Sequence, residues 1–282
     1  MTLRRVLIRA LDRPAGRGAL GAVVTCMARR VAPGVRAYFH RGMWVHRERD
    51  VIFVDSPTLD YHPSIFRAWA NELDRSFADA EDHWMYVYKP NPGDVILDIG
   101  AGKGEDTIAF SRAVGPSGRV IAIEAHPITF RCLRLFCELN GLDNVAAMNL
   151  AITDRTGPVA VESSGDWQAN RVGENCPPSS ARVSGVTVDE LVKLENLKRI
   201  DFLKMNIEGA EIAAIKGMEQ SLRITGALCI SCHDFRANRG DGEFFRTRAA
   251  VRDEIKRAGF RIVQRDEDPR PYVADQVNAV RQ

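Results

Sequence analysis

From residue 94 onward, short apolar runs alternate with longer stretches in which apolar residues recur every three or four positions. Short runs of this kind predict buried strands, and the longer stretches predict amphipathic helices. Near-continuous apolar strands separated by helices are typical of a parallel sheet covered on both faces. We therefore expect a doubly wound α/β fold, Rossmann-like, with a mostly parallel seven-stranded sheet. The predicted strands span 94–99, 119–124, 145–150, 201–207, 227–232, 260–264 and 273–280.

The intervening helices carry their own start and stop signals. Pro127 stands at the first position of one predicted helix, and Gly141 lies just past its end. Thr187 and Glu190 form a capping box that opens another. The predicted helices span 105–114, 127–140, 188–197, 210–222 and 244–258.

The first 80 residues follow a different pattern. The first fifty hold eleven arginines and three acids, a net charge of +8 in a chain whose total is +2. Two helices are expected, at 3–11 and 19–31, and the turn at 90–93 precedes the first strand of the core. We divide the chain into a basic, partly helical extension at 1–80 and a core domain at 81–282. Five aromatic or imidazole side chains of the extension are candidates to cap a pocket: Trp44, His46, Tyr61, His62 and Trp69.

Composition narrows the class of protein. A net charge of +2 excludes a nucleic-acid binder that relies on bulk charge, and we expect no nucleic-acid partner. No apolar run approaches the roughly 20 residues of a membrane span. Six irregularly spaced cysteines favour a reducing, cytoplasmic compartment. The arginine-rich extension either packs on the core as a solvated segment or makes a peripheral contact with an anionic membrane. The sequence does not indicate an oligomeric state.

The first predicted strand ends in a glycine-rich turn, Asp98-Ile-Gly100-Ala101-Gly102-Lys-Gly104. Dinucleotide sites need glycines spaced G-x-G-x-x-G, but the third position here is Glu105. Glu105 and Asp106 open the following helix, where two carboxylates would repel a pyrophosphate. An NAD-dependent oxidoreductase is therefore disfavoured, and a ligand without phosphate is expected.

The second predicted strand ends at Glu124, twenty residues after Gly104. An acid at this point can accept hydrogen bonds from both hydroxyls of a ribose. A nucleoside that is cationic and lacks phosphate describes S-adenosyl-L-methionine, which we take as the expected cofactor.

Together these motifs resemble class I methyltransferases that use S-adenosylmethionine. The segments 149–152, 188–191 and 200–211 narrow the resemblance to the FkbM-type family, over about residues 80–265. The family pattern has Asp where this chain has Asn206, and Asn where it has the Gly102–Lys103 pair. The motifs and the resemblance together assign cofactor binding to Asp98, Gly100, Ala101, Gly102, Gly104, Glu124, Ala125, Asn149 and Ala151.

Candidate catalytic residues lie where the central strands end. We expect His233 or Glu208 to act as the base that takes a hydroxyl proton, and Lys204 and Asn206 to orient the substrate or cofactor. A single Mg²⁺ held by Asn206, Glu208 and Asp234 is an alternative, but three ligands are too few to predict a metal site.

The resemblance implies an O-methyltransferase that acts on a hydroxyl of a small-molecule or glycan acceptor, such as a sugar, a glycolipid or a natural product. The loop-like segment at 162–184, which contains Trp167, is expected to act as a substrate lid. The alternative from another class is a module that binds S-adenosylmethionine and has lost catalysis, because Asn206 cannot take a proton at neutral pH.

Overall fold

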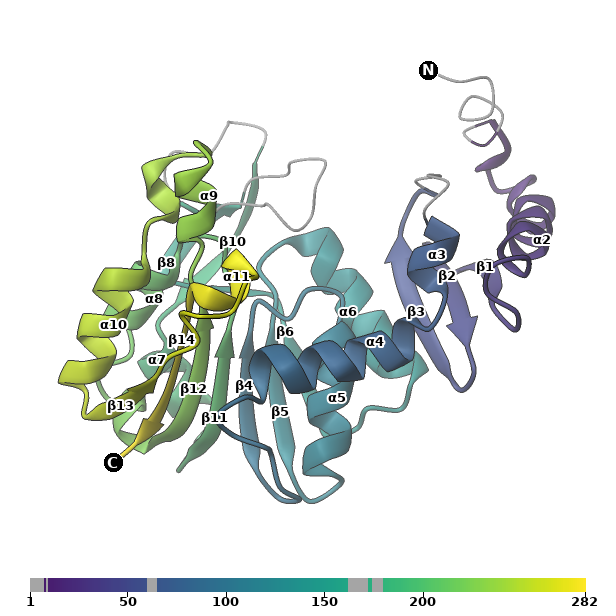
Figure 1. The fold of residues 1–282 in the computed structure, drawn as a ribbon. Coiled ribbons are helices and arrows are strands. Elements are labelled where there is room, and N and C mark those ends of the chain that lie inside the picture. Colours follow the sequence, from purple (N-terminus) through teal and green to yellow (C-terminus); the bar gives the residue numbers. More distant parts are fainter. Residues whose placement is uncertain (1–7, 9, 60–64, 162–171, 174–179) are drawn as a thin grey trace.

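The computed structural model describes residues 8, 10–59, 65–161, 172–173 and 180–282 (Figure 1). Its largest sheet has seven strands in the order β13-β14-β12-β11-β4-β5-β6. The bounds are β4 (Val95–Ile99), β5 (Arg119–Ile123), β6 (Val145–Met148), β11 (Ile200–Met205), β12 (Thr225–Ser231), β13 (Phe260–Val263) and β14 (Gln276–Arg281). Strands β4, β5, β6, β11 and β12 pair in parallel, and β14 runs antiparallel to both β12 and β13. The predicted seven-stranded, mostly parallel sheet is confirmed.

Helices cover both faces of this sheet. Helix α5 (Glu105–Val114), helix α6 (Pro127–Leu139) and the single turn η1 (Ala80–Trp84) pack on one face, against strand residues such as Ile96 and Phe202. Three helices pack on the other face: α7 (Val188–Leu194), α8 (Glu211–Lys216) and α10 (Arg248–Arg257). This arrangement follows from strand geometry, because successive side chains point to opposite faces of a sheet.

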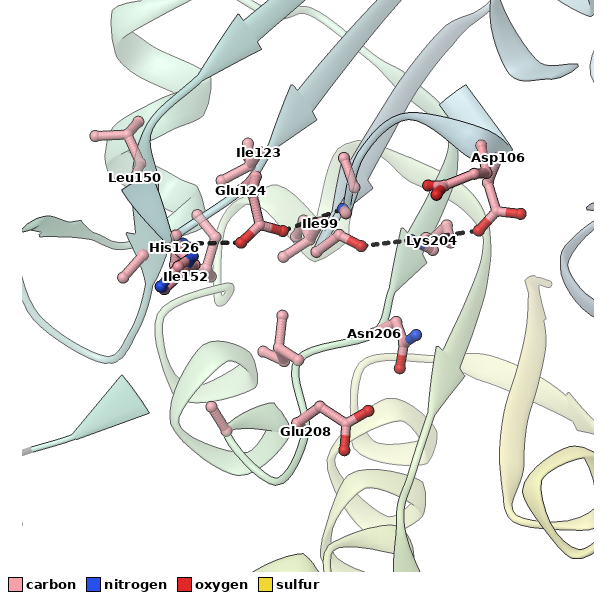
Figure 2. A pocket seen from close by; sticks show the side chains of 18 of the residues that line it. Ile99, Asp106, Ile123, Glu124, His126, Leu150, Ile152, Lys204, Asn206 and Glu208 are labelled. Atoms are coloured by element: carbon pink, nitrogen blue, oxygen red, sulfur yellow. Dashed lines mark hydrogen bonds and ion pairs between the residues drawn. The ribbon is translucent and has the colours of Figure 1, made fainter. Parts of the chain in front are cut away.

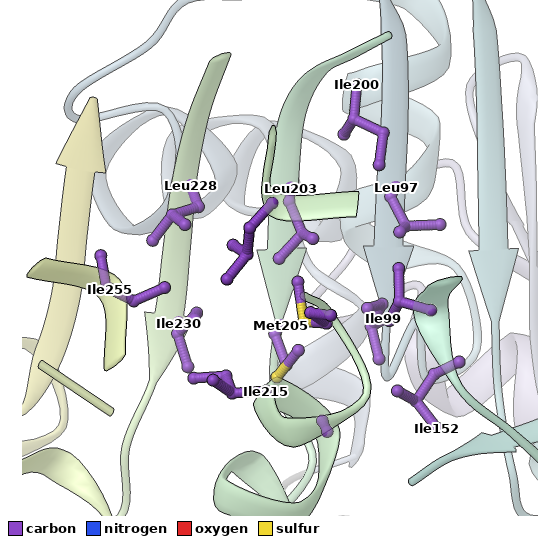
Figure 3. Packing of buried hydrophobic residues seen from close by; sticks show 14 of the residues in the cluster. Leu97, Ile99, Ile152, Ile200, Leu203, Met205, Ile215, Leu228, Ile230 and Ile255 are labelled. Carbon is purple, nitrogen blue, oxygen red and sulfur yellow. The ribbon is translucent and has the colours of Figure 1, made fainter. Parts of the chain in front are cut away.

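The main hydrophobic core lies between the sheet and the α7, α8 and α10 layer. Figure 3 shows Leu97, Leu203 and Leu228 side by side on neighbouring strands, with Ile215 and Ile255 packed against them from the helices. The three leucines are fully buried. Burying a leucine contributes about 1.5–3 kcal/mol, so this row of side chains fixes the register of the central strands.

Several predicted elements end earlier than the sequence pattern suggests. The helix predicted at 210–222 consists of α8 followed by the 3-10 turn η3 (Ser221–Ile224). Helix α8 ends because the chain turns at Gly217. A side chain at this position would collide with the carbonyl oxygen of Thr153. The helix predicted at 244–258 is divided into η4 (Glu243–Phe245) and α10. Asp234 causes this division by accepting hydrogen bonds from the backbone N–H groups of Thr247 and Arg248.

Two other boundaries also differ from prediction. The helix predicted at 188–197 ends at Leu194, shortly before Asn196 with its positive φ of 52°. The strand predicted at 273–280 begins only at Gln276, because Pro271 opens the short helix α11 (Pro271–Ala274).

A second sheet of four strands was not predicted. It has the order β7-β10-β8-β9 and consists of β7 (Leu150–Ile152), β8 (Gly157–Val161), β9 (Val172–Gly173) and β10 (Ala181–Val186). Part of the predicted lid at 162–184 is therefore strand. Residues 162–171 and 174–179, including Trp167, lie outside the described part of the chain.

The N-terminal extension contains a sheet as well as helices. Helix α2 (Arg17–Ala28) lies within the predicted 19–31 helix apart from its first two residues, whereas most of the predicted 3–11 helix lies outside the described residues. Three antiparallel strands follow: β1 (Arg36–His40), β2 (Met43–Glu48) and β3 (Val51–Ser56). Helices α3 (Ile65–Trp69) and α4 (Glu72–Asp79) then lead into η1 and the core. The prediction of a partly helical extension at residues 1–80 did not include this sheet.

The extension packs on the core domain through α6. Val45 and Phe53 of the small sheet contact Phe136 and Cys132 of the helix in one buried cluster. The Asn140 side chain completes the contact by donating to Ile52 O at 2.9 Å and accepting from Ile52 N at 2.8 Å. Within the described residues, no helix is both long enough and apolar enough to cross a membrane.

Candidate active site

The strand order reverses between β4 and β11, and the candidate site lies at the carboxyl ends of these two strands. Ligands of doubly wound sheets bind at such switch points. A cavity of about 460 Å³ opens there, between the glycine-rich turn, Glu124 and the end of β11 (Figure 2). We call it the donor cavity. Of the predicted site residues, its walls include Gly100, Ala101, Gly102, Glu124, Ala125, Ala151, Lys204, Asn206 and Glu208.

The glycine-rich turn has the backbone geometry that only glycine adopts without strain. Gly100, Gly102 and Gly104 have φ values of 74°, 59° and 105°. A Cβ on Gly100 would lie 1.9 Å from the carbonyl oxygen of Asn206, so the turn runs directly against the end of β11. Gly104 does not line the cavity. It stands at the N-cap of α5, where a side chain would collide with Phe136.

We expect Gly100→Ala to destabilise the protein by roughly 2–4 kcal/mol, because the clash with Asn206 adds to the strain of a positive φ. The change should also weaken ligand binding in the donor cavity. The matched control is Gly115→Ala, where φ is 63° and no atom lies within 4 Å of the added Cβ. Thermal unfolding of both variants measures the difference, and equal destabilisation would refute the tight contact.

A buried ion pair lies behind this turn. Lys204 Nζ is 2.9 Å from Asp98 Oδ1, donates to the carbonyl oxygen of Gly100 at 2.8 Å, and lies 3.9 Å from Asp106 Oδ2. Asp98 also accepts from Thr107 Oγ1 at 2.7 Å and is completely buried. Burial alone would lower the pKa of Lys204, but Asp98 and Asp106 raise it above its usual value. Asp98 therefore does not line the cavity, and it acts on the site through Lys204 and the turn.

Glu124 is held with its carboxylate in the donor cavity. Its oxygens accept from Gly102 N at 3.1 Å and from His126 N at 2.8 Å, and Figure 2 shows both contacts. Burial raises the pKa of Glu124 to about 7 in spite of these bonds. Asn149 does not line the cavity. Its side-chain amide donates to the carbonyl oxygens of Glu124 and Ala125 at 2.9 Å each and so fixes the end of β5.

The first turn of α5 supplies two further acidic side chains. Glu105 and Asp106 both line the donor cavity. Burial raises the pKa of Asp106 to about 7, against the opposing effect of Lys204. Two carboxyl groups occupy the position where a dinucleotide site binds its pyrophosphate. This placement agrees with the expectation of a ligand without phosphate.

Sequence reasoning missed a wall of the cavity that comes from the N-terminal extension. Four residues of α4, spaced to share one helix face, line the donor cavity: Glu72, Arg75, Ser76 and Asp79. Of the residues predicted to cap the pocket, the three that the structure describes do not line it. Trp44, His46 and Trp69 are buried in the core of the extension, and Tyr61 and His62 lie outside the described residues. The polar i, i+3, i+4, i+7 spacing in 72–79 was the available signal.

The two candidate bases bind each other. His233 Nε2 lies 3.2 Å from Glu208 Oε1, and its Nδ1 lies 3.1 Å from Glu211 Oε1. Burial would lower the pKa of His233, but the two carboxylates raise it to about 9. The imidazole is therefore protonated at neutral pH, which does not fit a free base. Burial would raise the pKa of Glu208, but His233 and Arg236, whose Nη1 donates at 2.6 Å, lower it.

A second cavity of about 340 Å³ adjoins the first, and we call it the acceptor cavity. Asn206 and Glu208 line both cavities. The acceptor cavity is otherwise lined mainly by aromatic and basic side chains: His83, Trp84, His233, Phe235, Arg236, Arg239 and Tyr272. At the junction, the side-chain oxygen of Asn206 is buried and has no hydrogen-bond partner among the residues that the structure describes. Glu208 stands beside it with a φ of 53°, an unusual backbone geometry for a residue with a side chain.

The residues proposed as a magnesium alternative do not gather at the junction. Asp234 lines neither cavity and instead accepts the backbone bonds that begin α10. Across the described part of the chain, no group of three or more His, Cys, Asp or Glu side chains is arranged to hold a metal ion.

Several solved structures are similar to this chain. The methyltransferase FkbM of Methylobacillus flagellatus KT shares 15% identity, covers 80% of this chain and 62% of its own, and gives a TM-score of 0.46. Aeropyrum pernix fibrillarin, in complex with S-adenosyl-L-methionine, shares 15% identity over 86% of this chain and 97% of its own, with a TM-score of 0.45. The O-methyltransferase of Bacillus cereus, in complex with SAH, shares 15% identity over 79% of this chain and 83% of its own, with a TM-score of 0.42.

No curated protein matches the chain. The model of the methyltransferase FkbM domain, however, matches residues 98–262, which is more than half of the chain. This match includes the glycine-rich turn, Glu124, the end of β11 and His233, and it confirms the resemblance drawn from those motifs. The chain belongs to the FkbM methyltransferase family.

Proposed function

We propose that this methyltransferase uses S-adenosyl-L-methionine to methylate a hydroxyl group of a sugar, glycan, glycolipid or natural product. The observation that carries the proposal is the buried oxygen of Asn206 at the junction of the two cavities, which has no hydrogen-bond partner within the described part of the chain. A buried acceptor without a donor is costly, so it indicates a ligand group that donates a hydrogen bond there. A hydroxyl supplies such a donor and is also the group that can be methylated.

The donor cavity fits S-adenosylmethionine in three respects. The Glu124 carboxylate can accept hydrogen bonds from both ribose hydroxyls. Leu150, Ala151 and Ile152 provide an apolar wall for the adenine ring. The carboxyl groups of Glu105 and Asp106 suit a cationic ligand without phosphate.

When bound, the cofactor supplies an electrophilic methyl group on a sulfonium. The protein must hold the acceptor oxygen in line with that group and exclude water. Asn206 would orient the hydroxyl by accepting its hydrogen bond. As the new oxygen–carbon bond forms and the carbon–sulfur bond breaks, the single hydroxyl proton would shift from its hydrogen bond with Asn206 to the carboxylate of Glu208, which lines the same junction. Its lowered pKa is no obstacle, because an oxygen that has gained a methyl group holds its proton far more weakly than a free hydroxyl.

The acceptor cavity supports a ring compound that carries hydroxyls. Trp84, Phe235 and Tyr272 provide aromatic surfaces for the apolar face of such a ring. Arg236 and Arg239 provide donors at the edge, although both are already paired with Asp241. This combination of a few aromatic surfaces with a few polar groups is usual for sites that bind small molecules.

The test is release of S-adenosylhomocysteine from S-adenosylmethionine in the presence of a panel of acceptors. The panel contains free and nucleotide-linked sugars, glycolipid extracts and amines of similar size, and product mass and NMR locate the methyl group. We expect turnover with hydroxylated saccharides and a methyl group on oxygen. Transfer to nitrogen or carbon, or no turnover with any hydroxyl acceptor, contradicts the proposal.

The alternative is a module that binds S-adenosylmethionine but has lost catalysis, motivated by Asn206 in place of the family's usual Asp. Asn206→Asp separates the two. If the amide is functional, a carboxylate beside Glu208 lowers turnover with the accepted substrate; if Asn206 is a lesion, the same change raises it. Binding of S-adenosylhomocysteine by the native protein and by Asn206→Asp is the control for intact folding.

A further inference from the structure

The donor cavity has two chemically different ends. Beside β7 its wall is apolar, formed by Leu150, Ala151, Ile152 and Val161. On the other side of the glycine-rich turn, α4 and the first turn of α5 contribute four acidic side chains: Glu72, Asp79, Glu105 and Asp106. Burial raises the pKa of Glu105, and the negative charge of Glu72 raises it further.

This asymmetry orients the donor. With the adenosine portion at Glu124 and the apolar end, the amino-acid portion extends toward the acidic end. That portion carries an ammonium group and a carboxylate. An ammonium fits among the carboxylates, and Arg75, which lines the same end, is suited to the ligand carboxylate. Lys204 is less suited, because Asp98 already binds its ammonium group.

Glu72 differs from the other acidic residues in being held by a buried histidine. His46 Nε2 lies 3.1 Å from Glu72 Oε2, and its Nδ1 lies 3.0 Å from Asp55 Oδ2. The imidazole is fully buried, whereas the Glu72 side chain is 16% exposed. The Glu72 carboxylate is therefore anchored in the core of the extension through His46, while Glu72 also lines the donor cavity.

The surroundings of His46 keep its ring in one orientation. The imidazole stacks between Phe53 and Trp69, with ring centroids 5.1 and 4.6 Å away. Trp69 Nε1 in turn donates to Asp55 Oδ1 at 3.1 Å. Burial would lower the pKa of His46, but Asp55 and Glu72 raise it to about 9, so the ring carries a proton at neutral pH.

We propose that Glu72 binds the ammonium group of the donor's amino-acid portion, and that His46 is the positioning residue that aims it. This proposal rests on the proposed use of S-adenosylmethionine and adds a binding residue outside the matched family domain, residues 98–262. It makes the β1–β3 sheet part of the donor site, because His46 and Asp55 both belong to that sheet.

The test compares S-adenosylhomocysteine with its deamino analogue, in which hydrogen replaces the α-amino group. Calorimetric titration of the full chain gives both dissociation constants. We expect the native protein to bind the analogue about 10–100-fold more weakly, as for loss of a charged hydrogen bond. In Glu72→Gln we expect the two ligands to bind almost equally, because affinity for S-adenosylhomocysteine falls and affinity for the analogue does not.

His46→Gln tests the positioning role. It removes the charge behind Glu72 and should reduce the preference for S-adenosylhomocysteine over the analogue by at least about threefold. A merely structural role would weaken both ligands equally and leave the preference intact. Glu81→Gln is the matched control, because Glu81 lies in η1, is 64% exposed in its side chain, and does not line the cavity. Thermal unfolding of each variant reports on folding.

The outcomes separate this proposal from the proposed function. If Glu72→Gln keeps the native preference, Glu72 does not bind the ammonium, while tight binding of S-adenosylhomocysteine to the native protein leaves the donor assignment in place. If the native protein binds neither nucleoside, both proposals fail. A preference that disappears in Glu72→Gln and persists in Glu81→Gln supports the assignment.

Discussion

Lys204→Met is expected to lower the free energy of unfolding by roughly 3–5 kcal/mol, the usual cost of breaking a buried ion pair by removing one partner. The ammonium group lies 2.9 Å from Asp98, and the two side chains are at most 1% exposed. Without Lys204, the Asp98 carboxylate stays buried with the Thr107 hydroxyl as its one donor among the described residues, and the carbonyl of Gly100 loses the Lys204 donor. Urea unfolding measures the loss.

The double variant Asp98→Asn/Lys204→Met provides the control. Removing the second charge should recover part of the lost stability, because the Asp98 carboxylate no longer stays buried without its partner. Lys216→Met, at an exposed lysine of α8, should change stability by less than about 0.5 kcal/mol. Native stability in Lys204→Met would show that the ion pair does not support the glycine-rich turn.

Glu124→Ala is expected to weaken binding of S-adenosylhomocysteine by on the order of 100-fold, since it removes the acceptor of two ribose hydrogen bonds. Calorimetric titration measures the change. Glu219→Gln is the control, because this glutamate is 82% exposed and lines neither cavity. Equal affinity of Glu124→Ala and the native protein would place the ribose elsewhere.

We also expect the affinity for S-adenosylhomocysteine to depend on pH, because Glu124 titrates in the neutral range. Burial raises the pKa of Glu124 to about 7 in the free protein. Below that pH the group is protonated and loses its charge as an acceptor, so the affinity should fall as pH is lowered from 8 to 5.5. In Glu124→Gln, which is neutral throughout, this part of the pH dependence should disappear. A native profile that is flat over this interval would contradict the assignment.

The sequence pattern predicted the seven strands because their signals are local. The parallel strands are mainly apolar runs bounded by a turn or a cap, as is typical of parallel strands buried on both faces. The second sheet was missed because β8 and β10 are amphipathic, and because β7 directly continues the apolar run of β6. Only the break at Asn149 separates those two strands.

The sequence predicted the part of the candidate site that is formed by residues at the carboxyl ends of the strands. Gly100, Glu124 and Asn206 stand directly at strand ends, so topology alone brings them together. The placement of Glu72 and His46 depends on how the extension folds over the core. The polar spacing in 72–79 marks one face of a helix, but it does not indicate what that face contacts. The state of His233 was also beyond prediction, because its proton depends on Glu208 and Glu211 reaching both ring nitrogens.

The position of β14 between β12 and β13 has a consequence for synthesis on the ribosome. Strand β12 ends at Ser231, but its antiparallel neighbour begins only at Gln276. Until β14 has emerged, the β12 edge is bare, and β13 has no strand through which to join the sheet. A bare edge can pair with other nascent chains. A premature stop between these strands would therefore yield an aggregation-prone fragment instead of a shortened enzyme, although the donor-site motifs would already have been translated.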